Sequence, residues 1–141
     1  MPKDYGQACP IARSLAFLGE RWTLLVIRDL LRGPKKFQQL TASLKGVGPG
    51  VLSQRLKLLE EEEIVERHVY AEHPLRAEYA LTSKGMELRT VVAALSVWGA
   101  RHMPGGHVLK HRECSHPIVM NYYCAHCEQT VPPADVTFKR D

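Results

Sequence analysis

The sequence predicts a mainly α-helical domain with a small β wing, followed by a small C-terminal appendage rich in Cys and His. Three observations lead to this prediction. Short segments with helical spacing of apolar residues, separated by Gly and Pro, fill the chain to about residue 62. Two alternating segments that read as a hairpin come next, and a last helical segment follows them. This order is that of a winged helix-turn-helix.

Three helices are expected before residue 45. Apolar residues recur at three- and four-residue steps over 9–18 and again over 21–31, and Gly33-Pro34 ends the second segment. A shorter helix is expected over 37–43, with Phe37 and Leu40 turned inward.

The next helix, from Val51 to about Glu62, follows a Gly/Pro turn at 46–50 and has two different faces. One face is apolar, and the other is polar and basic. Four glutamates, 60–63, close the helix; negative charge is unfavourable at a helix C-terminus and would repel phosphate. Only the first two turns should therefore approach a polyanion. The apolar face consists of Leu52, Leu56 and Leu59, and the polar face of Ser53, Gln54 and Lys57, with Arg55 alongside.

Strands are expected over 65–71 and 77–81, joined by a polar loop at 72–76 that contains a Pro. Thr82 or Ser83 should cap a long helix that runs to about Trp98. The apolar side of this helix consists of Met86, Val91, Leu95 and Trp98.

Charge is unevenly distributed along the chain. The formal net charge is +4, but residues 1–59 hold ten Lys and Arg against three acidic residues, and the acidic run follows at once. A basic half beside an acidic block favours a polyanionic partner bound in one orientation, and we expect double-stranded DNA.

The DNA major groove admits one α-helix, which reads bases with residues near its N-terminus. Gln54 can pair with adenine, and Arg55 or Lys57 can reach guanine or phosphate. Backbone N–H groups at Gly50 suit a phosphate, and Arg76 at the wing tip suits the minor groove. The alternative is that these side chains are only a solvated helix face. The predicted DNA-binding residues are Lys35, Lys36 and Gln38, which open the preceding helix, with Gly50, Ser53, Gln54, Arg55, Lys57 and Arg76.

The composition excludes several classes of function. No run of 18 apolar residues is present, so no membrane span is expected. Residues 1–10 lack the apolar core of a signal peptide, so we expect a cytoplasmic protein whose four cysteines are reduced, reactive or metal-bound. No nucleophile elbow, P-loop or pair of carboxylates suited to acid–base chemistry occurs, so we expect neither an enzyme nor any catalytic residue.

A linker at 103–106 divides a predicted DNA-binding and dimerisation domain, 1–104, from a zinc-ribbon-like appendage, 105–141. Two pairs of ligands, each with two residues between its members, lie nine residues apart in this appendage. Three thiolates and one imidazole suit a tetrahedral structural Zn²⁺. A tail without metal, or with a redox-active pair of cysteines, is the alternative. The predicted ligands are His111, Cys114, Cys124 and Cys127, with His107, His116 and His126 as rival imidazoles.

Several segments in fixed order resemble the HxlR-type winged-helix transcriptional regulators, relatives of the MarR class. They are Cys9-Pro10, LGERWTLLVIRDLLRGPKKFQQL, GVGPGVLSQRLKLLEEEEIVER and EYALTSKGMEL, and they span about residues 8–100. The resemblance implies a homodimer on a twofold-symmetric operator, with helices near 11–18 and 91–98 at the dimer interface. It also implies that the helix from Gly50 reads the major groove and that the wing, His73 to Arg76, contacts DNA.

The sequence departs from the family pattern at two positions. Gly48 stands where the family usually has a Ser suited to cap the recognition helix, and Glu63 stands where a Gly commonly ends it.

Cys9 matches the position of a cysteine that senses oxidants or electrophiles in some members. A helix N-terminus favours the reactive thiolate, although a small residue buried at the dimer interface is the alternative. The effector is not predicted.

A second function remains open. A winged helix followed by a zinc ribbon also occurs in basal transcription factors and in protein-interaction adaptors that bind no operator. Such a protein would have a weakly basic recognition face and an exposed hydrophobic ribbon, whereas Arg55 and Lys57 favour DNA reading.

Overall fold

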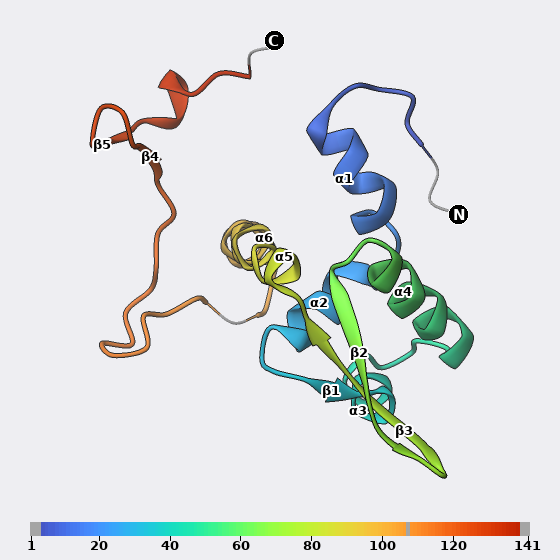
Figure 1. The fold of residues 1–141 in the computed structure, drawn as a ribbon. Helices are drawn as coiled ribbons and strands as arrows, with labels where there is room; N and C mark the ends of the chain where they lie inside the picture. The colour runs from blue at the N-terminus through green and yellow to red at the C-terminus, as the bar shows by residue number, and fades with distance from the viewer. Residues whose placement is uncertain (1–3, 107, 139–141) are drawn as a thin grey trace. The chain divides into compact units, whose positions relative to one another are not determined.

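The computed structural model describes residues 4–106 and 108–138 (Figure 1). The chain divides into two compact units, Met1–Val92 and Ala93–Asp141. The first unit contains the predicted winged helix-turn-helix. Its helices and first strand, in order, are α1 (Pro10–Leu18), α2 (Thr23–Leu30), β1 (Lys35–Lys36), α3 (Phe37–Ser43) and α4 (Pro49–Glu61).

The predicted helices of this unit are confirmed, with small shifts of their ends. The second helix begins at Thr23 instead of Arg21, because Trp22 has a positive φ of 78° and cannot continue a right-handed helix backwards. The fourth begins at Pro49, which suits the first helical position because its ring fixes φ and its missing N–H is not needed there.

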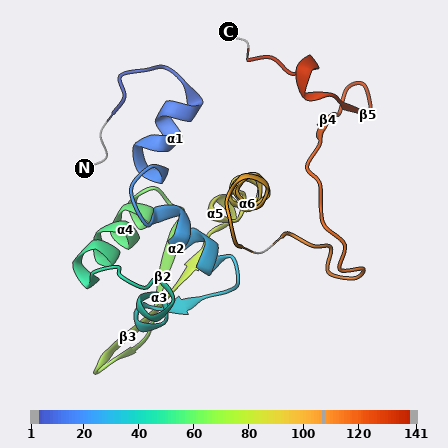
Figure 2. The ribbon, with the colours of Figure 1, turned by 180° about the vertical axis from the view of Figure 1, so that it is seen from behind.

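The wing has three strands instead of the two that the sequence predicts. β2 (Val65–Glu72) pairs antiparallel with β3 (Leu75–Leu81), and β1 pairs with the other edge of β3 through Lys35 opposite Tyr79. Lys35 and Lys36 were expected to open the third helix, but they form this short strand, and the helix starts at Phe37. Figures 1 and 2 show β2 and β3 extending together beyond the helices.

The hairpin loop is also shorter than expected. A loop over 72–76 is wrong, because Leu75 and Arg76 already pair with Glu72 and Ala71. Only His73 and Pro74 join the two strands.

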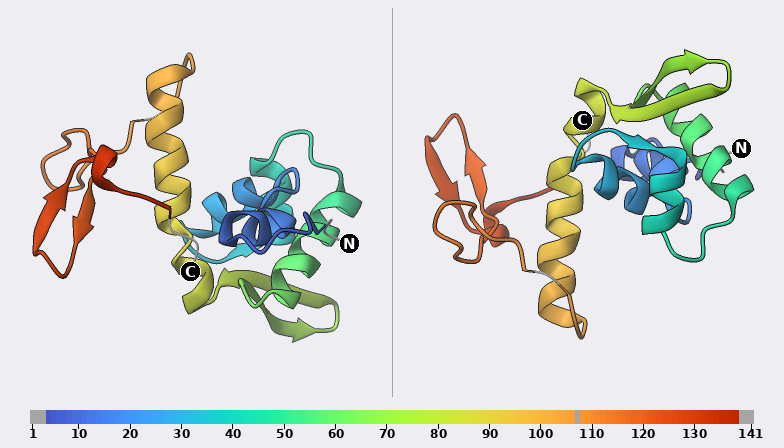
Figure 3. Two further views of the ribbon diagram at one scale, coloured as in Figure 1. Left: turned by 90° about the horizontal axis from the view of Figure 1, so that it is seen from above. Right: turned by 90° about the horizontal axis from the view of Figure 1, so that it is seen from below.

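The apolar face of α4 packs into the hydrophobic core of the first unit. Leu52, Leu56 and Leu59 are at most 1% exposed, so each stabilises the fold by roughly 1.5–3 kcal/mol through burial. Figure 3 shows the wing hairpin beside α4 in both of its views. The other buried apolar residues are Leu18, Val26, Ile27, Leu30, Leu40, Leu44, Val47, Ile64 and Val65.

The acidic end of α4 closes in a Schellman motif. The N–H of Ile64 donates to the Leu59 carbonyl at 2.8 Å, and the N–H of Glu63 donates to the Glu60 carbonyl at 3.0 Å. Glu63 has a φ of 56° in the left-handed region, where glycine is favoured. The helix therefore ends as the family pattern implies, but with a residue that is strained there.

The long last helix was expected to be continuous but is divided into α5 (Ser83–Met86) and α6 (Arg89–His102). Thr82 caps α5, as predicted, by accepting a hydrogen bond from the N–H of Gly85 at 3.0 Å. At the break, the N–H of Leu88 donates to the Gly85 carbonyl, three residues back instead of four. Leu88 packs against the core, which favours this tighter turn.

The second unit contains most of α6 and two hairpins. β4 (Tyr122–Cys124) pairs with β5 (Gln129–Val131), and a short 3₁₀ helix, η1 (Pro133–Asp135), follows. A bridge between Lys110 and Pro117 closes the other hairpin. The alternation of Ile118, Met120 and Tyr122 would suit one strand over 117–123 between the two pairs of predicted ligands, but within this range only Tyr122 and Tyr123 belong to a strand. None of the described helices is long and apolar enough to cross a membrane.

Candidate nucleic-acid interface

The polar face of α4 is presented as the sequence predicts. Ser53, Gln54 and Lys57 are exposed, on the side of the helix opposite to the buried leucines. All three belong to the first nine residues of α4. They are therefore available to a ligand outside the protein.

Arg55 has a different surrounding from its neighbours. Its Nε donates to the Arg21 carbonyl at 2.8 Å, and its Nη2 lies 3.3 Å from Oε2 of Glu20. Its side chain is only 17% exposed. The guanidinium thus joins α4 to the turn between α1 and α2.

The N-terminus of α4 has no side-chain cap. Gly48 stands at the N-cap with extended backbone, and Pro49 follows it. Gly50 and Val51 are exposed, and backbone N–H groups in the first turn of a helix have no acceptor within that helix. These groups and the positive end of the helix dipole suit a phosphate.

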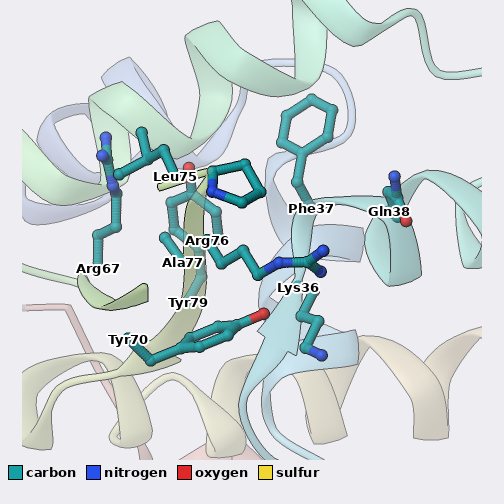
Figure 4. Close-up of a pocket in the computed structure, with 10 residues that line it drawn as sticks. Lys36, Phe37, Gln38, Arg67, Tyr70, Leu75, Arg76, Ala77 and Tyr79 are labelled. Carbon is teal, nitrogen blue, oxygen red and sulfur yellow. The ribbon is translucent and has the colours of Figure 1, made fainter. Parts of the chain in front are cut away.

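A groove of about 490 Å³ lies between β1, the start of α3 and the wing (Figure 4). Figure 4 shows the side chains of Lys36, Tyr70 and Arg76 extending toward one another across it. Nζ of Lys36 is 5.3 Å from the centre of the Tyr70 ring, in a cation–π contact. The lining residues are Lys36, Phe37, Gln38, Arg67, Tyr70, Pro74, Leu75, Arg76, Ala77 and Tyr79.

The charge of this groove is entirely positive, because Lys36, Arg67 and Arg76 line it and no acidic residue does. Burial raises the pKa of Tyr79, although nearby Arg67 opposes this shift. The groove suits a sugar-phosphate backbone, because its basic side chains can bind phosphate and its aromatic side chains can pack against sugar rings.

Several lining residues were not predicted from the sequence, among them Arg67 and Tyr70 of β2 and Tyr79 of β3. The alternation of β2 predicted a strand but no function for either of its faces. Arg and Tyr side chains are among those that contact DNA phosphate and sugar, so Arg67 and Tyr70, both exposed on β2, could have been added to the predicted set. Lys35 is half-buried in β1, and His73 is exposed at the tip.

Cys9 lies at the N-terminus of α1, as predicted, but as its N-cap residue and not as its first helical residue, which is Pro10. Its backbone is extended, its side chain is partly exposed, and its carbonyl accepts a hydrogen bond from the Arg13 N–H at 2.9 Å. Ile11 and Leu15 of the same helix are 55% and 42% exposed. The cysteine thus stands at the start of a helix that leaves large apolar side chains uncovered.

The four predicted metal ligands are brought together in two pairs. His111 Nδ1 lies 3.2 Å from Sγ of Cys114. Hydrogen bonds from Cys127, through its backbone and side chain, and from the His126 backbone lower the pKa of the Cys124 thiol. Within the described residues, no group of three or more His, Cys, Asp or Glu is close enough to share an ion. His107, one of the rival imidazoles, lies outside those residues.

Comparison with known families gives a match over most of this fold. Residues 17–106 match the family described as HxlR-like helix-turn-helix. An uncharacterised HTH-type transcriptional regulator of Mycobacterium tuberculosis is 34% identical over 131 residues, which cover 90% of this chain and 82% of that protein. The HTH-type transcriptional regulator YodB of Bacillus subtilis is 41% identical over 91 residues, 64% of this chain and 81% of YodB.

Solved structures similar to this chain are also of transcriptional regulators. A candidate transcription factor from Pseudomonas aeruginosa superposes with a TM-score of 0.72 at 36% identity, covering 94% of this chain and 92% of that one. The reduced form of YodB superposes with a TM-score of 0.59 at 37% identity, covering 72% of this chain and all of the other. YodB has also been solved after treatment with diamide.

Proposed function

Because this chain belongs to the HxlR-like helix-turn-helix family of transcriptional regulators, we propose that it acts as a homodimer that reads a twofold-symmetric operator in double-stranded DNA. The observation that carries the proposal is the polar face of α4. Its exposed residues, Ser53, Gln54 and Lys57, stand on a helix that is fixed by three buried leucines. A helix held in this way can enter the major groove without bending.

Base reading and backbone binding fall to different residues in this proposal. Gln54 can make the paired hydrogen bonds that adenine offers in the major groove, and Lys57 reaches guanine or phosphate. Arg55 is not among the base-contacting residues of this proposal, because its guanidinium forms an ion pair with Glu20 and a hydrogen bond to the Arg21 carbonyl. Phosphate and sugar contacts come from the exposed first turn of α4, from the start of α3 and from the wing. The residues are Gly50, Lys35, Lys36, Gln38, Arg67, His73 and Arg76.

A twofold operator requires a dimer, and the exposed apolar residues of α1 and α6 support one. On α6, Val91, Leu95 and Trp98 are 42%, 52% and 55% exposed, and large apolar surfaces on a small soluble protein mark contact sites. Ile11 and Leu15 of α1 are a second set of exposed apolar side chains. A closed dimer of two identical chains would cover these residues.

The proposal is tested by selecting bound DNA from a random pool and by sedimentation of the protein. We expect an enriched palindromic site and a dimer that Leu95→Glu dissociates, while Ala42→Glu, an exposed position on α3, leaves the dimer intact. A pool without enrichment would overturn operator reading in favour of an adaptor role. A wild-type protein that sediments as a monomer would overturn the dimer.

We further propose that oxidants or electrophiles regulate DNA binding through Cys9, in the cytoplasm. The support is its place at the start of α1 beside exposed Ile11 and Leu15, together with the structures of YodB in reduced and diamide-treated forms. Modification of a thiol at this place would alter the packing of α1. Diamide should lower operator affinity in the wild type and in Cys114→Ser but not in Cys9→Ser. Equal loss in all three proteins would contradict sensing at Cys9.

A further inference from the structure

The two hairpins of the tail repeat one local geometry. Each hairpin carries two predicted ligands three positions apart: His111 and Cys114 in the first, Cys124 and Cys127 in the second. In both, the residue after the second ligand has a left-handed backbone, Ser115 at φ 59° and Glu128 at φ 53°. In the first hairpin the N–H of His111 donates to the His116 carbonyl, five residues on. In the second, Cys124 pairs with Gln129, also five residues on.

The repeat extends one position outward. Lys110 pairs with Pro117 in the first hairpin, and Tyr123 pairs with Thr130 in the second. His111 and Cys124 are therefore equivalent, and so are Cys114 and Cys127. This equivalence selects His111 over the rival imidazoles of His116 and His126, since these two match Gln129 and Glu113 in the other hairpin and neither matches a predicted ligand.

In the first hairpin the two predicted ligands already lie close together. Nδ1 of His111 is 3.2 Å from Sγ of Cys114. In the second hairpin, Cys124 ends β4 and Cys127 lies in the turn that joins β4 to β5. Each pair of ligands is therefore carried by one tight turn, as the spacing in zinc ribbons requires.

The tail has no apolar core to hold it. Among the described residues from 108 to 138, none is buried. Val119, Tyr123 and Phe138 are 73%, 65% and 91% exposed. Modules of this size without a core are ordered by disulfides or by a metal ion.

We propose that the two hairpin tips together bind one Zn²⁺ ion through four ligands: His111, Cys114, Cys124 and Cys127. In the present structure the tips are two separate pairs, so binding requires the segment between the hairpins to bend. Residues 118–121 of that segment have no helix or strand to resist bending. One nitrogen and three sulfur ligands fill a tetrahedral shell, so the ion would be structural, with no open position for catalysis.

The test is zinc analysis of the full-length protein purified without an affinity tag, together with the absorption spectrum of the Co²⁺-substituted protein. We expect about one equivalent of zinc and thiolate-to-cobalt bands of a tetrahedral three-thiolate site. Cys114→Ser, Cys127→Ser and His111→Asn should each lose most of the metal. Cys9→Ser, His116→Asn and His126→Asn, the matched controls, should keep it.

Three results would overturn the proposal. One is less than about a tenth of an equivalent of zinc with free thiols. A second is a disulfide between Cys124 and Cys127 in the protein as isolated. A third is metal that depends on Cys127 but not on His111 and Cys114, since a single hairpin would then hold it. None of these outcomes depends on DNA binding, so the proposal can fail while the proposed function stands.

Discussion

Arg55 of α4 forms an ion pair with Glu20 at 3.3 Å, while its Nε donates to the Arg21 carbonyl at 2.8 Å. The contact spans 34 positions of sequence and links α4 to the turn before α2. This engagement distinguishes Arg55 from Gln54 and Lys57, which are exposed. Arg55 therefore sets the position of the helix, whereas Gln54 and Lys57 face outward.

Arg55→Ala should destabilise the fold without changing which DNA sequence is preferred. A hydrogen bond from a charged group contributes about 1.5–3 kcal/mol, and a partly exposed ion pair adds about 0.2–1 kcal/mol. Urea unfolding measures the loss. Lys57→Ala, one exposed residue on the same helix, should change the free energy of unfolding by less than about 0.5 kcal/mol. Equal free energies of unfolding for Arg55→Ala and wild type would show that the contacts of Arg55 with Glu20 and Arg21 do not stabilise the fold.

Glu63→Gly should stabilise the protein. Glu63 has a left-handed backbone in the Schellman motif, and glycine adopts that conformation without the steric cost of about 1–2 kcal/mol. After the entropy that glycine loses on folding, a gain of about 0.5–1 kcal/mol should remain. Glu61→Gly, within the same helix, should instead cost about 1 kcal/mol. A rise in melting temperature only for Glu63→Gly is the expected pattern; destabilisation by both changes would be inconsistent with it.

Gly85→Ala should destabilise the protein because a Cβ at this position would lie 2.2 Å from the Ile64 carbonyl oxygen. Backbone at both sites would have to move, at a cost of about 1–3 kcal/mol. Gly50→Ala is the control, since a Cβ there meets no atom within 4 Å. That change should be neutral or stabilise by up to about 1 kcal/mol. Chemical denaturation of both variants makes the comparison, and similar losses would show that crowding at Gly85 is not the cause.

Lys36→Ala should weaken binding to all DNA sequences by a similar factor. Lys36 lines the positively charged groove, where a phosphate contact carries no sequence information. The slope of log affinity against log salt should fall by about 1. Lys84→Ala should leave the slope unchanged, because Nζ of Lys84 donates to the Glu62 carbonyl at the acidic end of α4. A change of preferred sequence in Lys36→Ala would place this residue among the base readers.

The helices of the first unit were predictable because their information is local. Apolar spacing and the Gly and Pro residues place α1 to α4 to within a few residues, and the orientation of Gln54 follows from the burial of Leu52 and Leu56. β1 was not predictable, since two lysines form a strand only because Tyr79 and Glu78 of β3 lie opposite them. For the same reason, no local pattern indicates that Arg55 is engaged by a residue in another segment.

Operator selection with Gln54→Ala tests the central claim, that the exposed face of α4 reads DNA, most directly. Wild type and variant are each used to select DNA from a random pool at the same salt concentration. The claim predicts that the variant still enriches the palindrome but loses about 1–3 kcal/mol of discrimination at one base pair of each half-site. A variant that enriches the identical site with undiminished preference at every position would contradict it.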